Sequence, residues 1–173
     1  MDINFEFFVK VVFMGIGATL LMDLWRFFLL KTARVSSLDL GLLGRWVGHA
    51  FLGKLLHGSI AKSPPVRGEQ LLGWLTHYGI GVTFSFLLPI VWGEPWLKTP
   101  TLLPALIVGV GTVLAPWCLM QPAMGMGFAA SLAPKPYQVR LRNLAIHTVY
   151  GFGLYVSAHL LQKLNFFLGM GEG

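Results

Sequence analysis

Four ionisable residues stand inside long apolar runs of the sequence, where a charge is costly. They are Asp23, Arg26, His77 and His147. Ionisable groups inside apolar membrane segments usually face one another or a water-filled cavity, and they often mark the route of a proton, an ion or a ligand. A carboxylate beside histidines, which change charge near neutral pH, is suited to proton exchange or to holding a polar ligand. These residues are therefore the first candidates for a functional site.

The spacing of small residues predicts which way three of these side chains face. Residues four apart share a helix face. By this rule Asp23 shares a face with Gly15 and Thr19, His77 with Gly73, Gly81 and Ser85, and His147 with Asn143 and Gly151. Membrane helices approach one another along stripes of small residues. We therefore expect Asp23, His77 and His147 to point at each other in one polar cluster. Further ligand-binding or proton-relay candidates are Arg26, Tyr78, Gln121, Asn143 and Tyr150.

Each member of this cluster also has a simpler interpretation. Asp23 and Arg26 are three residues apart and could neutralise each other on one helix. A single histidine in a membrane helix often makes only a hydrogen bond between helices. The remaining histidines, His49, His57 and His159, fall near the ends of apolar runs, and the sequence assigns them no role.

Weaker signals point to a metal or a haem. His77 and His147 lie on two helices at similar depth and could ligate a b-type haem. The other weak candidates, Cys118, Met120, Met124 and Met126, carry the soft sulfur ligands that suit Cu(I). Methionine is also a common filler of apolar segments. The sequence contains no His-Glu-x-x-His, Walker, paired-cysteine or Gly-x-Ser-x-Gly motif, so whether the protein is an enzyme stays open.

The composition indicates that membrane helices position these residues. The 173 residues are 55% hydrophobic and 12% charged, with a mean hydropathy of +0.67. A soluble domain usually has about a quarter charged residues, so an ordinary soluble domain is excluded. The formal net charge is +6, but the basic residues lie mostly between apolar runs, as topology determinants do. We therefore expect a lipid bilayer as partner and no nucleic acid.

Four apolar stretches approach or exceed the roughly 20 residues that a helix needs to cross a bilayer. They are residues 5–30, 70–93, 102–120 and 143–165. The first stretch contains Lys10 besides Asp23 and Arg26, but a spanning helix remains the best interpretation. Asp2 and Glu6 occupy what would be the positive region of a signal peptide, so we expect this helix to be retained. The prediction is an all-α integral membrane protein, a single domain over residues 1–173 built as a four-transmembrane-helix bundle.

Basic residues between the stretches predict the orientation of the bundle. The linker after the first stretch contains Lys31, Arg34, Arg45, Lys54, Lys62 and Arg67, and the linker after the third contains Lys135, Arg140 and Arg142. The opposite side offers Lys10, Lys98 and Lys163. Because cytoplasmic loops are enriched in lysine and arginine, we expect both linkers in the cytoplasm. Both termini would then lie on the periplasmic side of a bacterial inner membrane, and the polar cluster near the cytoplasmic side.

Two further patterns concern the linkers and the hairpins. Residues 38–56 place apolar residues at helical spacing with a basic polar face, which is typical of a short amphipathic helix lying in the membrane interface. The run GIGATL at residues 15–20 resembles GVGTVL at 109–114, and the His-Tyr-Gly residues at 77–81 have a counterpart at 147–153. A duplicated helical hairpin would explain this likeness. Such short motifs leave the duplication open.

The order of short motifs also resembles a known family. The residues that carry the resemblance are 15–25 (GIGATLLMDLW), 44–49 (GRWVGH), 73–78 (GWLTHY), 115–122 (APWCLMQP) and 143–151 (NLAIHTVYG). Together they resemble a family of small multi-span bacterial inner-membrane proteins known only as a domain of unknown function. The resemblance covers nearly the whole chain. It implies a multi-span membrane protein and implies no activity.

The leading functional hypothesis is a binding or transport module for a small molecule or ion, with a protonatable cluster of Asp23, His77 and His147. Four spans are few for a transporter, so a homodimer is expected. The alternatives are a haem- or metal-binding redox protein, a membrane enzyme that acts on lipid with a histidine as general base, and a structural subunit. The identity of the ligand is not predicted.

Overall fold

A computed structural model describes residues 5–33 and 39–167, and every regular element in these ranges is helical. Four helical segments are long and apolar enough to cross a membrane: Phe5–Thr32, Glu69–Trp92, Leu102–Ala123 and Pro136–Leu164. The expected all-helical architecture with four membrane-length segments is thus confirmed for the described residues. Asp2, Arg34 and Leu38, which entered the sequence argument, lie outside them.

Prolines divide two of the four segments into shorter helices. The first segment is α1 (Phe5–Ala33), and the second is α3 (Glu69–Ser85) followed by α4 (Leu87–Trp92). Proline at position i cannot donate to the carbonyl of residue i−4, so Pro89 ends the regular hydrogen bonding near Ser85. The third segment consists of α6 (Leu102–Gly111), the π-helical η2 (Pro116–Met120) and α7 (Gln121–Ala123), in which Pro116 and Pro122 act in the same way.

The last segment is α8 (Pro136–Phe167), which begins seven residues before the predicted start. Proline is favoured at the first position of a helix, so Pro136 starts α8 ahead of its apolar part. The shorter elements are α2 (Leu40–Phe51), η1 (Ile60–Lys62), α5 (Pro95–Lys98) and η3 (Phe128–Ala130).

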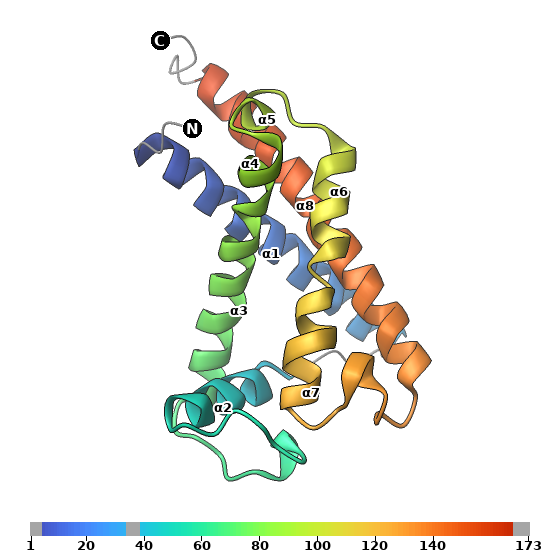
Figure 1. The fold of residues 1–173 in the computed structure, drawn as a ribbon. Helices are drawn as coiled ribbons and strands as arrows, with labels where there is room; N and C mark the ends of the chain where they lie inside the picture. Colours follow the sequence, from blue (N-terminus) through green and yellow to red (C-terminus); the bar gives the residue numbers. More distant parts are fainter. Residues whose placement is uncertain (1–4, 34–38, 168–173) are drawn as a thin grey trace.

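The long helices form two pairs that are joined along one side (Figure 1). Helix α1 packs against α3 and against α8, and α6 packs against α8. The described parts of α3 and α6 share no comparable interface, and the second and third segments diverge toward the lower end of the view, where α2 and α7 lie (Figure 1). The beginning of α1 and the end of α8 lie at the opposite, upper end (Figure 1).

Glycines set the closest helix contacts. A Cβ atom on Gly81 of α3 would overlap the hydroxyl of Thr19 on α1, and one on Gly109 of α6 would overlap the backbone of Gly151 on α8. Side chains larger than hydrogen would therefore force either pair apart. In contrast, a Cβ on Gly79 or Gly111 would meet nothing within 4 Å, which places these two glycines on unpacked helix surfaces.

Helix α2 exists where an amphipathic helix was predicted, but it is shorter than residues 38–56. Asp39 caps its first turn by accepting a hydrogen bond from the backbone N–H of Gly41 at 2.8 Å. Gly53, with φ of +80°, turns the chain after Phe51. Glycine takes such a φ without strain, so the helix ends five residues early. The residues of α2 that are buried are Leu40, Gly41, Leu43, Gly44, Gly48 and His49. Gly44 lies directly against Gly73 of α3, so packing on α3 accounts for much of the apolar pattern.

Candidate functional site

The centre of the site is a carboxylate that joins two helices. Asp23 Oδ1 on α1 accepts a hydrogen bond from Nε2 of His77 on α3 at 3.1 Å. The same oxygen accepts from Nη1 of Arg26 at 2.8 Å. The three side chains are between 13% and 16% exposed. Because a carboxylate only accepts, the bond fixes the proton of neutral His77 on Nε2. The predicted contact of Asp23 with His77 and the predicted ion pair with Arg26 are therefore present together.

The second oxygen of this carboxylate has no partner. Asp23 Oδ2 is buried and makes no hydrogen bond with any described residue. The phenol of Tyr78, the neighbour of His77, approaches the carboxylate, and the indole Nε1 of Trp25 is another buried polar atom without a bond in the described part of the chain. Buried polar atoms are usually paired. Asp23 Oδ2 therefore offers an open acceptor position.

His147 does not join Asp23 and His77 in one hydrogen-bonded cluster, contrary to the expectation that all three point at each other. Its Nδ1 lies 2.9 Å from the hydroxyl oxygen of Thr112, which follows α6. The reason is the contact between Gly109 and Gly151, which turns this face of α8 toward α6 rather than toward α1.

The hydrogen bonds of Thr112 determine which nitrogen of His147 holds a proton. Thr112 Oγ1 lies 2.6 Å from the carbonyl oxygen of Gly109, and two oxygens this close need a hydrogen between them. The single hydroxyl proton is thereby used, so Nδ1 of His147 must donate to Thr112. In the neutral ring, Nε2 then carries a lone pair. His147 is thus an oriented base or ligand with its Nε2 uncommitted among the described residues.

The other predicted candidates connect helices on either side of this centre. With its amide in the orientation that pairs donors with acceptors, Asn143 of α8 accepts from Gln121 Nε2 at 2.7 Å and from Trp117 Nε1 at 3.2 Å. Gln121 is buried, and its Oε1 has no partner among the described residues. Tyr150 donates to the carbonyl of Gly81 at 2.5 Å, which ties α8 to α3. Tyr150 is therefore a packing residue, whereas Gln121 adds a second open acceptor.

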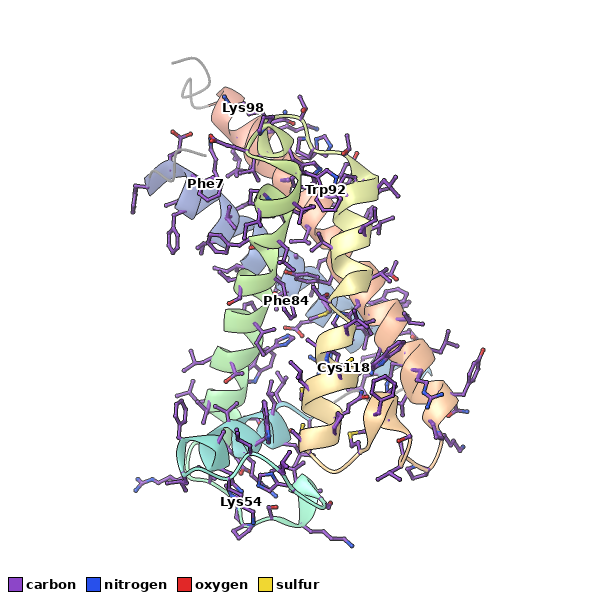
Figure 2. The ribbon with its side chains drawn as sticks, in the orientation of Figure 1. Phe7, Lys54, Phe84, Trp92, Lys98 and Cys118 are labelled. Carbon is purple, nitrogen blue, oxygen red and sulfur yellow. The ribbon has the colours of Figure 1, made fainter. Side chains whose placement is uncertain are left out.

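The metal candidates are scattered. Cys118 is exposed on η2 (Figure 2), and Met124 is buried. Met120 and Met126 are half-buried, and His77 and His147 bond to different helices. In the described ranges no three His, Cys, Asp or Glu side chains gather around a common point. The sulfur residues therefore form no ligand set that the geometry defines.

Sequence reasoning missed a buried histidine pair in the segment between α2 and α3. His49 Nδ1 lies 2.8 Å from His57 Nε2, and His49 Nε2 donates to the carbonyl of Pro64 at 3.0 Å. The two side chains are 8% and 7% exposed, and His57 Nδ1 has no partner in the part of the chain described. His49 falls on the apolar face of α2, which was the available signal. Nothing in the sequence indicated that His57 turns back onto it.

An ion pair holds the same segment to α3. Arg45 donates to both carboxylate oxygens of Glu69, at 2.8 and 2.9 Å, and also to the carbonyls of Ala61 and Ser63. Hydrogen bonding to Glu69 raises the pKa of Arg45 above its ordinary value. The backbone N–H of His57 in turn donates to the carbonyl of Ala123 after α7. The linker thus connects the ends of the second and third segments.

The fold and the site define a class: all-helical proteins with four membrane-length segments in which an acid–imidazole pair joins the first segment to the second. The chain belongs to the family described as "Protein of unknown function (DUF2938)", whose model matches residues 12–161. This confirms the resemblance to a domain of unknown function, and the matched range includes every site residue above. No curated protein and no solved structure matches the chain.

Proposed function

We propose that the protein is a four-pass integral membrane protein that binds a small polar ligand or ion at the Asp23–His77 pair and exchanges a proton there. One observation carries the proposal. Asp23 Oδ1 is bonded to α1 and α3 groups at once, while Oδ2 is buried without a partner. Ionisable residues in membrane helices are costly and are usually functional.

The missing partner indicates the chemistry of the ligand. An unpaired buried acceptor costs about 1–3 kcal/mol. A cation or a hydrogen-bond donor that reaches Asp23 Oδ2 recovers that free energy, and Gln121 Oε1 and His147 Nε2 are acceptors as well. An anion at Asp23 Oδ2 would meet another negatively charged oxygen instead. The ligand is therefore a cation or a neutral donor such as an alcohol or an amine.

The Asp23–His77 bond supplies the link to proton movement. Arg26 already balances the charge of Asp23, so a proton on His77 gives these three side chains a net positive charge that opposes a cationic ligand. Loss of that proton removes the repulsion and favours the cation. A proton and a cationic ligand therefore compete at this pair, so ligand affinity should rise with pH.

The basic linkers support a cytoplasmic position for the α2 end of the bundle. Both termini would then be periplasmic in a bacterial inner membrane. Alkaline phosphatase, which is active only outside the cytoplasm, should be active when fused after residue 173 and inactive when inserted after Lys54. Inverted activities would reject this orientation. We also propose a homodimer, which light scattering of the detergent-solubilised protein would detect as twice the mass of one chain.

The binding proposal is tested by titrating the purified protein with Na⁺, K⁺ and ethanolamine at pH 6 and pH 8. We expect at least one probe to bind more tightly at pH 8 and to lose this dependence in Asp23→Asn. Glu6→Gln, which alters an exposed ion pair with Lys10 on the same helix, is the matched control. Binding that is equal in wild type and Asp23→Asn would refute the site.

A further inference from the structure

An apolar groove lies between the two helix pairs, next to the candidate site. It has a volume of about 390 Å³, within the range of about 300–1,000 Å³ that is typical of ligand pockets. One wall is formed by Phe84, Leu87 and Trp92 of α3 and α4, and the other by Ile107, Val108 and Gly111 of α6. In Figure 2 Phe84 lies between α3 and α6, and Trp92 lies nearer the upper end.

One residue of the groove also contacts the site. Its lining includes Thr112, whose hydroxyl fixes the proton of His147 on Nδ1. On the opposite wall, Phe84 is seven residues from His77. Seven residues are two helical turns, so the two side chains share a face of α3 about 10 Å apart along the axis. The Phe84 and Thr112 end of the groove is therefore the end nearer to His77 and Asp23, about 10 Å away along α3.

We infer that the ligand of this site is an amphiphile with an apolar chain and a head that donates hydrogen bonds, such as a long-chain alcohol or amine. This inference rests on the proposed function and names its ligand class. The chain occupies the groove, and the head points to the Asp23, His77 and His147 end, where Asp23 Oδ2 and His147 Nε2 are uncommitted acceptors. A fatty acid ionised at neutral pH is disfavoured, because its carboxylate would bring a second negative charge next to Asp23.

Bromine on the chain end reports where such a molecule lies, because it quenches tryptophan fluorescence on contact. The probe is 11-bromo-1-undecanol, added to the full-length protein in lipid nanodiscs. With its hydroxyl at the Thr112 end, its bromine reaches the part of the groove near Trp92. We expect a saturable quenching component that disappears in Trp92→Phe. Quenching that rises linearly with probe and is the same in Trp92→Phe would overturn the inference.

Two glycines provide a matched pair of variants. A Cβ at Gly111, inside the groove, and one at Gly79, outside it, both meet nothing within 4 Å, so neither substitution by leucine creates a clash at its first atom. Gly111→Leu fills the groove, so several methylenes of the probe can no longer be buried there. The affinity of the probe, obtained from the saturable quenching, should therefore fall by about tenfold or more. In Gly79→Leu the affinity should stay within about threefold of wild type. Equal effects of the two variants would overturn the inference.

The head group and the site are tested with the same assay. 1-Bromoundecane, which lacks a donor, and 11-bromoundecanoate should show no saturable component, and Asp23→Asn should weaken binding of the alcohol. If all three bromo compounds bind alike and Asp23→Asn has no effect on them, the groove holds only bilayer chains and the inference is wrong. If Na⁺, K⁺ or ethanolamine binds in an Asp23-dependent manner while the alcohol does not, the inference fails and the proposed function stands.

Discussion

His77 Nε2 lies 3.1 Å from Asp23 Oδ1, although the two residues are 54 positions apart in the chain. The bond connects α3 to α1 beside the close contact of Gly81 with Thr19. Arg26 donates to the same oxygen, and the other oxygen stays open. One carboxylate thus holds two helices together and retains a position for a further donor.

Replacing this carboxylate by an amide should destabilise the protein. In Asp23→Asn the amide oxygen can still accept from His77, but Arg26 loses its anionic partner in a largely buried position. We expect the free energy of unfolding to fall by about 1–3 kcal/mol, measured by thermal unfolding in a mild detergent. Glu6→Gln changes an exposed pair four residues apart and should leave the melting temperature unchanged, since such pairs contribute little. Equal melting temperatures for all three proteins would show that the Asp23 pair contributes nothing to stability.

The contact of α2 with α3 should tolerate no side chain at Gly73. A Cβ there would overlap the carbonyl of Leu40, whereas a Cβ on Gly79, in the same helix, meets open space. We expect Gly73→Ala to cost about 1–3 kcal/mol through overpacking and Gly79→Ala to be neutral or slightly stabilising, because alanine favours helix. Thermal unfolding of the two variants compares them directly. A smaller loss in Gly73→Ala than in Gly79→Ala would contradict the packing of α2.

The stability of the linker between α2 and α3 should depend on the shape of the Arg45 side chain and not only on its charge. Lysine cannot donate at once to both oxygens of Glu69 and to the carbonyls of Ala61 and Ser63. Arg45→Lys should therefore increase hydrogen exchange in residues 55–66 severalfold. Arg67→Lys, at an exposed position of the same linker, is the control and should match wild type.

The raised pKa of Arg45 also predicts the pH dependence of this segment. A base whose folded pKa exceeds its unfolded pKa contributes its stabilisation below the unfolded value and loses it only as pH rises beyond that value. Arginine has an unfolded pKa above 12. In wild type, the protection of the linker amides from hydrogen exchange, corrected for their intrinsic exchange rates, should therefore stay constant between about pH 7 and pH 10. A fall within this interval would contradict the role of the guanidinium.

The proton on His147 should depend on Thr112. Nitrogen NMR of labelled histidine should show the Nδ1–H form for His147 in wild type. In Thr112→Val the hydroxyl that accepts from Nδ1 is lost, and the signal should shift toward a mixture of both tautomers. Thr83→Val removes an exposed hydroxyl that bonds only within its own helix and should leave the spectrum unchanged. A wild-type spectrum in Thr112→Val would show that another group orients the ring.

Apolar length and small-residue spacing were enough to predict the four segments and the meeting of Asp23 with His77. Both features follow from the local sequence, because a stripe of glycine and serine decides which helix face can approach a neighbour. The direction of His147 could not be predicted in this way. Its stripe of small residues faces α6 because Gly109 of α6 and Gly151 of α8 are in close contact. When a helix has two neighbours, the packing of the whole bundle determines which of them its small-residue stripe contacts.

The histidine pair and the environment of α2 show a different limit. His49 and His57 meet because the chain turns at Gly53 and because the backbone of His57 is held by Ala123, a residue of a distant segment. The amphipathic pattern of α2 predicted an apolar partner, but it did not distinguish a lipid surface from the face of α3. Tertiary contacts of irregular segments carry no periodic signal in the sequence.

The packing of α1 has a mechanical consequence. Gly17 of α1 lies against Ser157 of α8, and Gly153 of α8 lies against the backbone of Ala18. Interfaces formed by backbone and small side chains have few rotamers to rearrange, so movement across them proceeds as rotation or sliding of whole helices. Helices α3 and α6 share no such interface over their described lengths. Rotation about the α1–α8 contact would therefore move α3 relative to α6, while the bond from His57 to Ala123 limits the separation of the second and third segments at the level of α2 (Figure 1).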